Sequence, residues 1–118
     1  RPALLAYLRQ MAGLTGSRIV VTTGSNHSQH TVDGNVSDHW TGDAADLGNS
    51  ANGGIGGNDR NFLACLRLGG VPEASAARMV ASGGLFTLNH RGLRIQCIWK
   101  TLAGGNHFTH VHVGVRPN

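Results

Sequence analysis

The spacing of apolar residues predicts a helix and then a strand at the beginning of the chain. Apolar side chains recur every three or four positions within residues 3–11, which is typical of one face of a helix that ends near Gly13. Residues 18–23 are rich in β-branched side chains and predict a buried strand. Residues 24–58 are mostly small and polar with little periodicity, which predicts a loop. A loop of that length in so small a protein is unusual unless it has a function.

Two further helices are predicted in the second half of the chain. Residues 59–68 regain helical spacing and are followed by Gly69 and Gly70. Residues 72–82 have Pro72 in their first turn and Gly83 beyond their end, an arrangement that favours a helix. Glu73, the only glutamate of the sequence, is expected to be a favourable charge at the start of this helix.

The remaining apolar residues follow the two-residue period of strands. Residues 85–88 and 93–99 predict a hairpin whose connection is residues 89–92, and positions 93, 95, 97 and 99 are expected to share one face. In the last strand, residues 108–115, valines alternate with histidines, so the valines are expected to be buried and the histidines to face a cleft. The pattern as a whole predicts an α+β fold, a small antiparallel sheet with helices packed on one side and long glycine-rich loops.

The size of the chain predicts a single domain, residues 1–118. The sequence begins at Arg1 without Met and contains no leader-like segment, which suggests a domain excised from a larger protein. It also lacks the roughly 18 consecutive apolar residues that a membrane span requires. We therefore expect a monomer without a membrane span.

Charge and cysteine content leave several possibilities open. The net charge is +4, and the ten basic residues are scattered without a run or stripe. On charge alone, nucleic acid, anionic membranes and acidic cell-wall polymers are all possible partners, although a plain soluble surface is the simplest interpretation. Cys65 and Cys97 form either two buried thiols or one disulfide, and buried thiols are favoured because cysteine is among the most buried residue types.

Histidines are unusually numerous and clustered. The seven histidines outnumber the six acidic residues. One of them, His90, lies in the predicted hairpin connection and is expected to have no functional role. The other six are His27, His30, His39, His107, His110 and His112. Neutral imidazole is the commonest metal ligand, and two histidines at alternate positions of a strand project from one face.

A carboxylate close to one of these histidines extends the candidate metal set. His39 and Asp46 add a nitrogen and an oxygen donor, with Gly42 able to turn the chain between them. Two nitrogens and one carboxylate form an open zinc site that leaves a position for water, whereas a structural zinc needs four protein ligands. A closed site of that kind would have to recruit Cys65 or Cys97 from elements that are expected to be core.

Residues 37–46 (SDHWTGDAAD), followed by the His110-Val111-His112 element, resemble the paired signature of zinc peptidases of the D-alanyl-D-alanine carboxypeptidase type. That type includes phage endolysins and vancomycin-resistance D,D-peptidases and, more distantly, the lysostaphin and hedgehog folds. The resemblance implies that His39, Asp46 and His112 bind Zn²⁺, that His110 faces the substrate and that Ser37 lines the same pocket. It also implies an antiparallel sheet that carries both elements.

The sequence departs from this pattern at the general base. Many members of the family have Glu three residues before the last histidine ligand, where this chain has Thr109. His110 is the best candidate for the base. It resembles the first histidine of the His-x-His element in a sister branch of the family, where that histidine acts as the general base. His107 is a second candidate, with substrate contact, base catalysis and no role all left open.

Polar residues after the first predicted strand are candidates for binding the substrate's carboxylate. Related peptidases tend to carry such residues in this region, but the usual Arg is missing here. We expect Gln29, a neighbouring polar side chain from among Asn26, His27 and His30, or an Arg from elsewhere to do so. Asp33, Asp38 and Asp43 are further candidates for orienting a ligand imidazole, although such residues more often form turns.

These features lead to one functional hypothesis and two alternatives. The hypothesis is zinc-dependent hydrolysis of an amide bond in peptidoglycan stem peptides or cross-bridges. The enzyme is expected to be a D,D- or L,D-peptidase, with endopeptidase preferred to carboxypeptidase action. The expected substrate of this enzyme is a peptidoglycan peptide rather than nucleic acid. The enzyme is expected to act on the bacterial cell wall, as an extracellular, periplasmic or phage-delivered protein. The first alternative is a zinc-containing wall-binding module without catalysis. The second, a glycan-cleaving enzyme, needs two facing carboxylates and is poorly supported.

Overall fold

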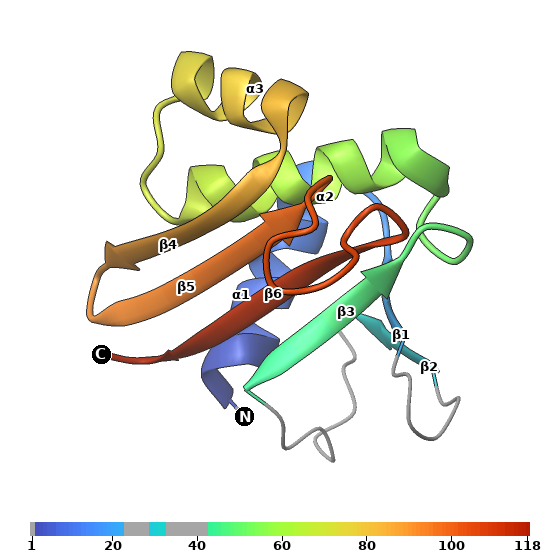
Figure 1. The fold of residues 1–118 in the computed structure, drawn as a ribbon. Coiled ribbons are helices and arrows are strands. Elements are labelled where there is room, and N and C mark those ends of the chain that lie inside the picture. The colour runs from blue at the N-terminus through green and yellow to red at the C-terminus, as the bar shows by residue number, and fades with distance from the viewer. Residues whose placement is uncertain (1, 23–28, 33–42) are drawn as a thin grey trace.

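The computed structural model describes residues 2–22, 29–32 and 43–118. Within these ranges the helices and strands follow one another in the order shown in Figure 1: α1 Pro2–Thr15, β1 Ile19–Thr22, β2 Gln29–Val32, β3 Ala44–Gly48, α2 Gly54–Leu68, α3 Glu73–Ser82, β4 Gly84–His90, β5 Leu93–Trp99 and β6 His110–Pro117. No helix among these residues is long and apolar enough to cross a membrane.

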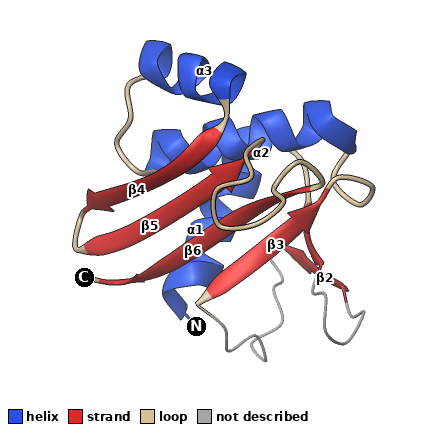
Figure 2. Ribbon diagram, in the orientation of Figure 1, coloured by secondary structure: helices blue, strands red, loops and turns tan. Residues whose placement is uncertain are grey.

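The main sheet has four strands in the order β3-β6-β5-β4, and each neighbouring pair is antiparallel. Strands β1 and β2 form a separate antiparallel pair. Figure 2 shows the helices behind and above the main sheet, while the loop between β5 and β6 crosses the face turned toward the viewer. The fold is α+β with a small antiparallel sheet, so this prediction is confirmed.

The core lies between the inner face of this sheet and the helices α1 and α2. Apolar residues of α1 are spaced at three and four positions, and the inner faces of β5 and β6 supply alternate residues. The fully buried members of this set include Leu4, Leu8, Met11, Ile95, Cys97, Trp99, Val111 and Val113. Each large apolar side chain buried in this way contributes about 1.5–3 kcal/mol to folding. The predicted burial of the valines of β6 is therefore confirmed, as is that of the inner face of β5.

A disulfide joins Cys65 of α2 to Cys97 of β5 across the core. The prediction of two buried thiols was therefore wrong, although both residues are buried as expected. The two cysteines are 32 positions apart in sequence. Sequence separation alone does not reveal that α2 packs on β5, and that packing brings the two sulfur atoms together.

The prediction of an unbroken loop over residues 24–58 was wrong within the described part of that segment. It contains β2, β3 and the first turn of α2. The sequence of β3, AADLG, is a poor strand former, but strand preference depends on the neighbouring strand, and here β6 provides the pairing. The start of α2, GIGG, is equally poor for a helix. Tertiary contacts therefore override local preference in this segment.

Two buried asparagines fasten this irregular segment to the rest of the fold. Asn52 accepts a hydrogen bond from the backbone N–H of Val20 at 2.9 Å and donates to the carbonyls of Val20 and Gly48, each at 2.8 Å. The side-chain amide of Asn58 donates to the carbonyl of Leu47 at 2.7 Å. These amides satisfy backbone groups that the short strands leave without a ladder partner.

The hairpin and the last strand differ from their predicted bounds. β4 extends to His90, so the connection to β5 is two residues, Arg91 and Gly92, rather than four. Both residues have positive φ, 52° and 76°, as a type I′ turn requires. β6 starts at His110 and not at residue 108. The preceding residues instead close a loop in which the backbone N–H of Lys100 donates to the carbonyl of His107 at 2.7 Å.

Candidate functional site

The seam between β3 and β6 brings the two parts of the sequence signature together. Asp46 of β3 lies directly opposite His112 of β6 in the antiparallel register. Their neighbours Leu47 and Val113 are fully buried on the inner face. Because side chains alternate along a strand, Asp46 and His112 must both project from the opposite, open face. Burial of the apolar neighbours therefore fixes the direction of the polar pair.

Asp46 and His112 are in direct contact. The Nδ1 atom of His112 lies 3.1 Å from the Oδ1 atom of Asp46. The Nε2 atom of His110 lies 3.8 Å from the same oxygen. The hydrogen bond with His112 is the main cause that lowers the pKa of the Asp46 carboxyl, and partial burial opposes it. Asp46 is consequently a carboxylate at neutral pH, with its oxygen shared between two imidazoles.

The neighbouring residue Thr109 contacts the other nitrogen of His110. Its Oγ1 atom lies 3.1 Å from the His110 Nδ1 atom, so the hydroxyl helps to hold the ring. Burial lowers the pKa of His110, while the Asp46 carboxylate raises it and His107 and His112 lower it further. The net lowering favours the neutral imidazole, which has one nitrogen available as a proton acceptor.

His107 lies beside these two histidines, in the loop before β6. Its side chain is buried, and its ring centroid is 4.9 Å from that of His110 and 5.9 Å from that of His112. Its Nδ1 atom lies 3.2 Å from the carbonyl oxygen of Gly105. The ring is thus held at the site by its own loop.

A hydroxyl that the sequence analysis did not single out ties β1 to the site. Thr22 donates from Oγ1 to the backbone carbonyl of Asp46 at 3.2 Å and accepts from the N–H of Gly48 at 3.0 Å. A side chain at position 48 would come within 2.9 Å of this hydroxyl, so glycine allows the close approach. Gln29 is paired with Thr22 in the β1–β2 ladder, which places its backbone next to this contact.

Two of the three predicted zinc ligands, Asp46 and His112, are among the residues that the structure describes. Among residues 2–22, 29–32 and 43–118, no group of three or more His, Cys, Asp or Glu side chains is arranged to hold a metal ion. His39 lies outside the described residues, as do Ser37, His27, Asn26, Asp33 and Asp38. The donors that are described, a carboxylate oxygen and an imidazole nitrogen in contact, are of the types that Zn²⁺ accepts. Asp46 and His112 therefore fit two of the three predicted ligand positions.

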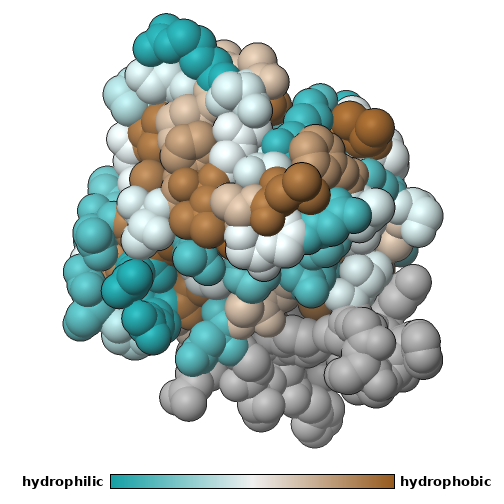
Figure 3. All heavy atoms as spheres, viewed as in Figure 1, coloured by the Kyte–Doolittle hydropathy of each residue, from teal (hydrophilic) through white to brown (hydrophobic). Residues whose placement is uncertain are grey.

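Apolar side chains border this polar centre. Leu102 and Phe108, in the loop between β5 and β6, are 72% and 50% exposed, and Leu85 of β4 is 39% exposed. Figure 3 shows apolar residues, in brown, over β4 and around this loop. A substrate lying across the open face would meet both apolar and polar surface.

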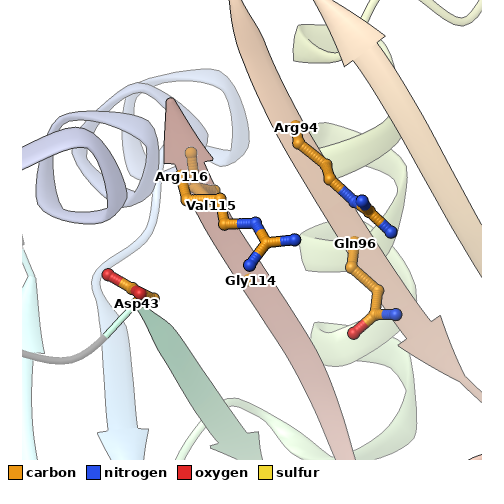
Figure 4. A pocket seen from close by; sticks show the side chains of 6 residues that line it. All are labelled: Asp43, Arg94, Gln96, Gly114, Val115 and Arg116. Atoms are coloured by element: carbon orange, nitrogen blue, oxygen red, sulfur yellow. The ribbon is translucent and has the colours of Figure 1, made fainter. Parts of the chain in front are cut away.

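A second polar feature on the open face was missed by the sequence analysis. A pocket of about 230 Å³ is lined by Asp43, Arg94, Gln96, Gly114, Val115 and Arg116 (Figure 4). The backbone carbonyl of Asp43, a candidate for orienting a ligand imidazole, accepts a hydrogen bond from the N–H of Val115 at 2.8 Å. The two arginines come from neighbouring strands. The signal for Arg94 in the sequence was its outward phase on the strand predicted at residues 93–99, whereas Arg116 lay beyond the predicted end of the last strand.

Comparison with known proteins gives no further guide. No family model, curated protein or solved structure matches the chain.

Proposed function

We propose that this protein is a zinc-dependent peptidase that hydrolyses an amide bond in peptidoglycan stem peptides or cross-bridges. The observation that carries the proposal is the contact between Asp46 and His112, directly opposite each other on β3 and β6 and 3.1 Å apart. The two residues come from separate halves of the resembled signature, 66 positions apart. A chance resemblance in either half gives no reason for them to meet.

The residues that would hold the zinc are His39, Asp46 and His112. A zinc ion bound there supplies a Lewis acid that polarises the scissile carbonyl and lowers the pKa of water from about 15.7 toward about 7. Asp46 suits this role because its lowered pKa keeps the carboxylate ionised. Without metal, the Nδ1 atom of His112 contacts the carboxylate of Asp46. Zinc binding would therefore require this contact to rearrange so that both side chains can face the ion.

His110 is the proposed proton carrier. It is on the same face of β6 as His112, and burial lowers its pKa, which keeps the ring neutral and able to accept a proton from the attacking water. The imidazolium formed in this way is stabilised by the Asp46 carboxylate 3.8 Å away, and it then donates the proton to the leaving amine. His107, beside both rings, is proposed to contact the substrate and is the second candidate for the base. Ser37 and Gln29 remain predicted substrate contacts.

The alternative is a wall-binding module that keeps zinc and lacks catalysis. The observation that favours it is Thr109, which stands where many relatives carry the general-base glutamate and which contacts His110 instead. The two proposals differ in whether removal of His110 changes anything other than stability.

Purified cell walls incubated with the metal-loaded protein distinguish these possibilities. We expect newly released amino groups and no new reducing ends, with release reduced at least about 100-fold by His110→Ala, since general acid–base catalysis contributes about 10²–10⁴-fold. His90→Ala is the matched control, because His90 lies at the far end of β4 and is outside the proposed site. Zinc binding without release of amines, unchanged by His110→Ala, would establish the binding module instead.

A further inference from the structure

Two arginines stand directly opposite each other on the open face of the sheet. Arg94 of β5 is paired with Arg116 of β6 in the antiparallel register, and both side chains are exposed. Side chains in directly opposite positions have Cβ atoms about 4.5–5.5 Å apart, and like charges there are destabilising. Neither guanidinium forms an ion pair with another described residue. The fold thus keeps a repulsive pair that an anion would neutralise.

Both arginines line the pocket of about 230 Å³ described above. Two residues nearer the metal candidates along each strand, Gln96 is paired with Gly114, which has no side chain to fill the space in front of β6. In Figure 4 the Arg116 side chain extends over β6 toward β5, from which Arg94 and Gln96 project. Guanidinium and amide N–H groups all donate hydrogen bonds, so this part of the pocket is built to bind an acceptor.

We propose that Arg94, Arg116 and Gln96 form a subsite for a carboxylate of the peptide substrate. This inference rests on the proposed peptidase function. A guanidinium binds a carboxylate through two parallel hydrogen bonds, and the Gln96 amide provides a further neutral donor. Asp43 lines the same pocket, so the described residues of its lining comprise two cationic side chains and one anionic side chain, a balance that suits a singly charged group.

The position of the subsite also bears on which bond is cut. Strand positions advance by roughly 3.4 Å, so Gly114 lies roughly 7 Å and Arg116 roughly 14 Å beyond His112. An extended peptide covers at most about 3.6 Å per residue. A carboxylate in the pocket is therefore at least two residues from the cleaved bond. A carboxypeptidase that removes one residue needs the carboxylate closer, so the subsite favours an endopeptidase.

The binding test uses the whole chain with metal removed, so that no peptide is hydrolysed and the result does not depend on zinc. The probes are a stem tetrapeptide with a free C-terminal carboxylate and the same peptide as its C-terminal amide, measured by titration calorimetry. We expect the acid to bind about tenfold more tightly, which corresponds to about 1.4 kcal/mol. Arg94→Gln and Arg116→Gln should each reduce this preference, and the double variant should abolish it.

Arg78→Gln is the matched control, because it removes the same charge from α3, away from the pocket. An acid preference that survives in the double variant would overturn the subsite. Inorganic phosphate is the competing probe. If it binds more tightly than the acid peptide and depends on the same arginines, the pocket serves a phosphate-bearing polymer and the peptide assignment is wrong.

Cleavage of one defined muropeptide by the zinc-loaded protein tests the spacing. Mass spectrometry should show a cut at least two residues from the carboxylate, and release of a single terminal amino acid would contradict the inference. Failure of the proposed function gives a different result, namely no cleavage by any variant while the acid preference of the metal-free protein persists.

Discussion

The two faces of the β3–β6 strand pair are formed by alternate residues of the same two paired segments and have opposite properties. The inner face, with Leu47, Val111 and Val113, is fully buried against the helices. The open face, with Asp46 and His112, is polar and partly exposed, with side-chain exposures of 44% and 24%. The comparison indicates a division of labour in which the apolar face provides the stability and register, and the polar face is left available for chemistry.

The largest effect on folding is expected from the inner face. Leu47→Ala deletes a fully buried side chain and should lower the free energy of unfolding by about 3–4 kcal/mol, measured by denaturant titration of the metal-free protein. His112→Ala, one strand away on the open face, should change it by less than about 1 kcal/mol. Equal losses from the two substitutions would break the proposed division between the faces.

The disulfide should stabilise the inner face by a somewhat smaller amount. Cys97 is paired with Val113 in the register, and its bond to Cys65 ties α2 to the sheet. Replacing both cysteines with alanine should cost about 2–4 kcal/mol in unfolding free energy, because the open chain gains conformational entropy when unfolded. The zinc affinity of the folded double variant should stay within about threefold of the original. A large loss of affinity would mean that the open face depends on the crosslink.

The smallest effect is expected from the titration of Asp46 on the open face. Its pKa is lowered in the folded protein, so ionisation adds stability above the unfolded value near 3.9. That contribution should be lost as pH falls through the lowered folded value. In the metal-free protein, the melting temperature of Asp46→Asn should therefore fall less steeply with decreasing pH than that of the original protein. Thermal unfolding at a series of pH values measures this difference. A steeper decline would show that Asp46 is not stabilised by its histidine neighbours.

The same contrast explains what the sequence could and could not predict. The alternation of valine and histidine in β6 has the period of a strand, so the burial of its valines was predicted correctly. The cleft in front of its histidines stays a prediction. The local pattern missed β3, because residues 44–48 are poor strand formers whose structure comes from pairing with β6. Only the resemblance implied a sheet that carries both elements. The disulfide between Cys65 and Cys97 and the alignment of Arg94 with Arg116 depend on contacts between distant segments. Local patterns do not contain that information.

For the candidate site, the resemblance to the zinc peptidases implied that Asp46 and His112 share one site, and the two residues are in contact across β3 and β6. The sequence did not indicate the buried position of His107 or the contacts of Thr22, which arise from a loop closure and from the packing of β1 on β3. The roles of His39, Ser37 and Gln29 stay predictions, since no described side chain tests them.

Equilibrium zinc binding by the 118-residue chain tests the central claim most directly. Titration calorimetry with metal analysis should give one zinc per chain. Asp46→Ala and His112→Ala should each weaken binding at least about 100-fold, because loss of even an outer partner of a metal ligand costs about 10–100-fold. His90→Ala should leave the affinity unchanged. Retention of the original zinc affinity by either Asp46→Ala or His112→Ala would contradict the account.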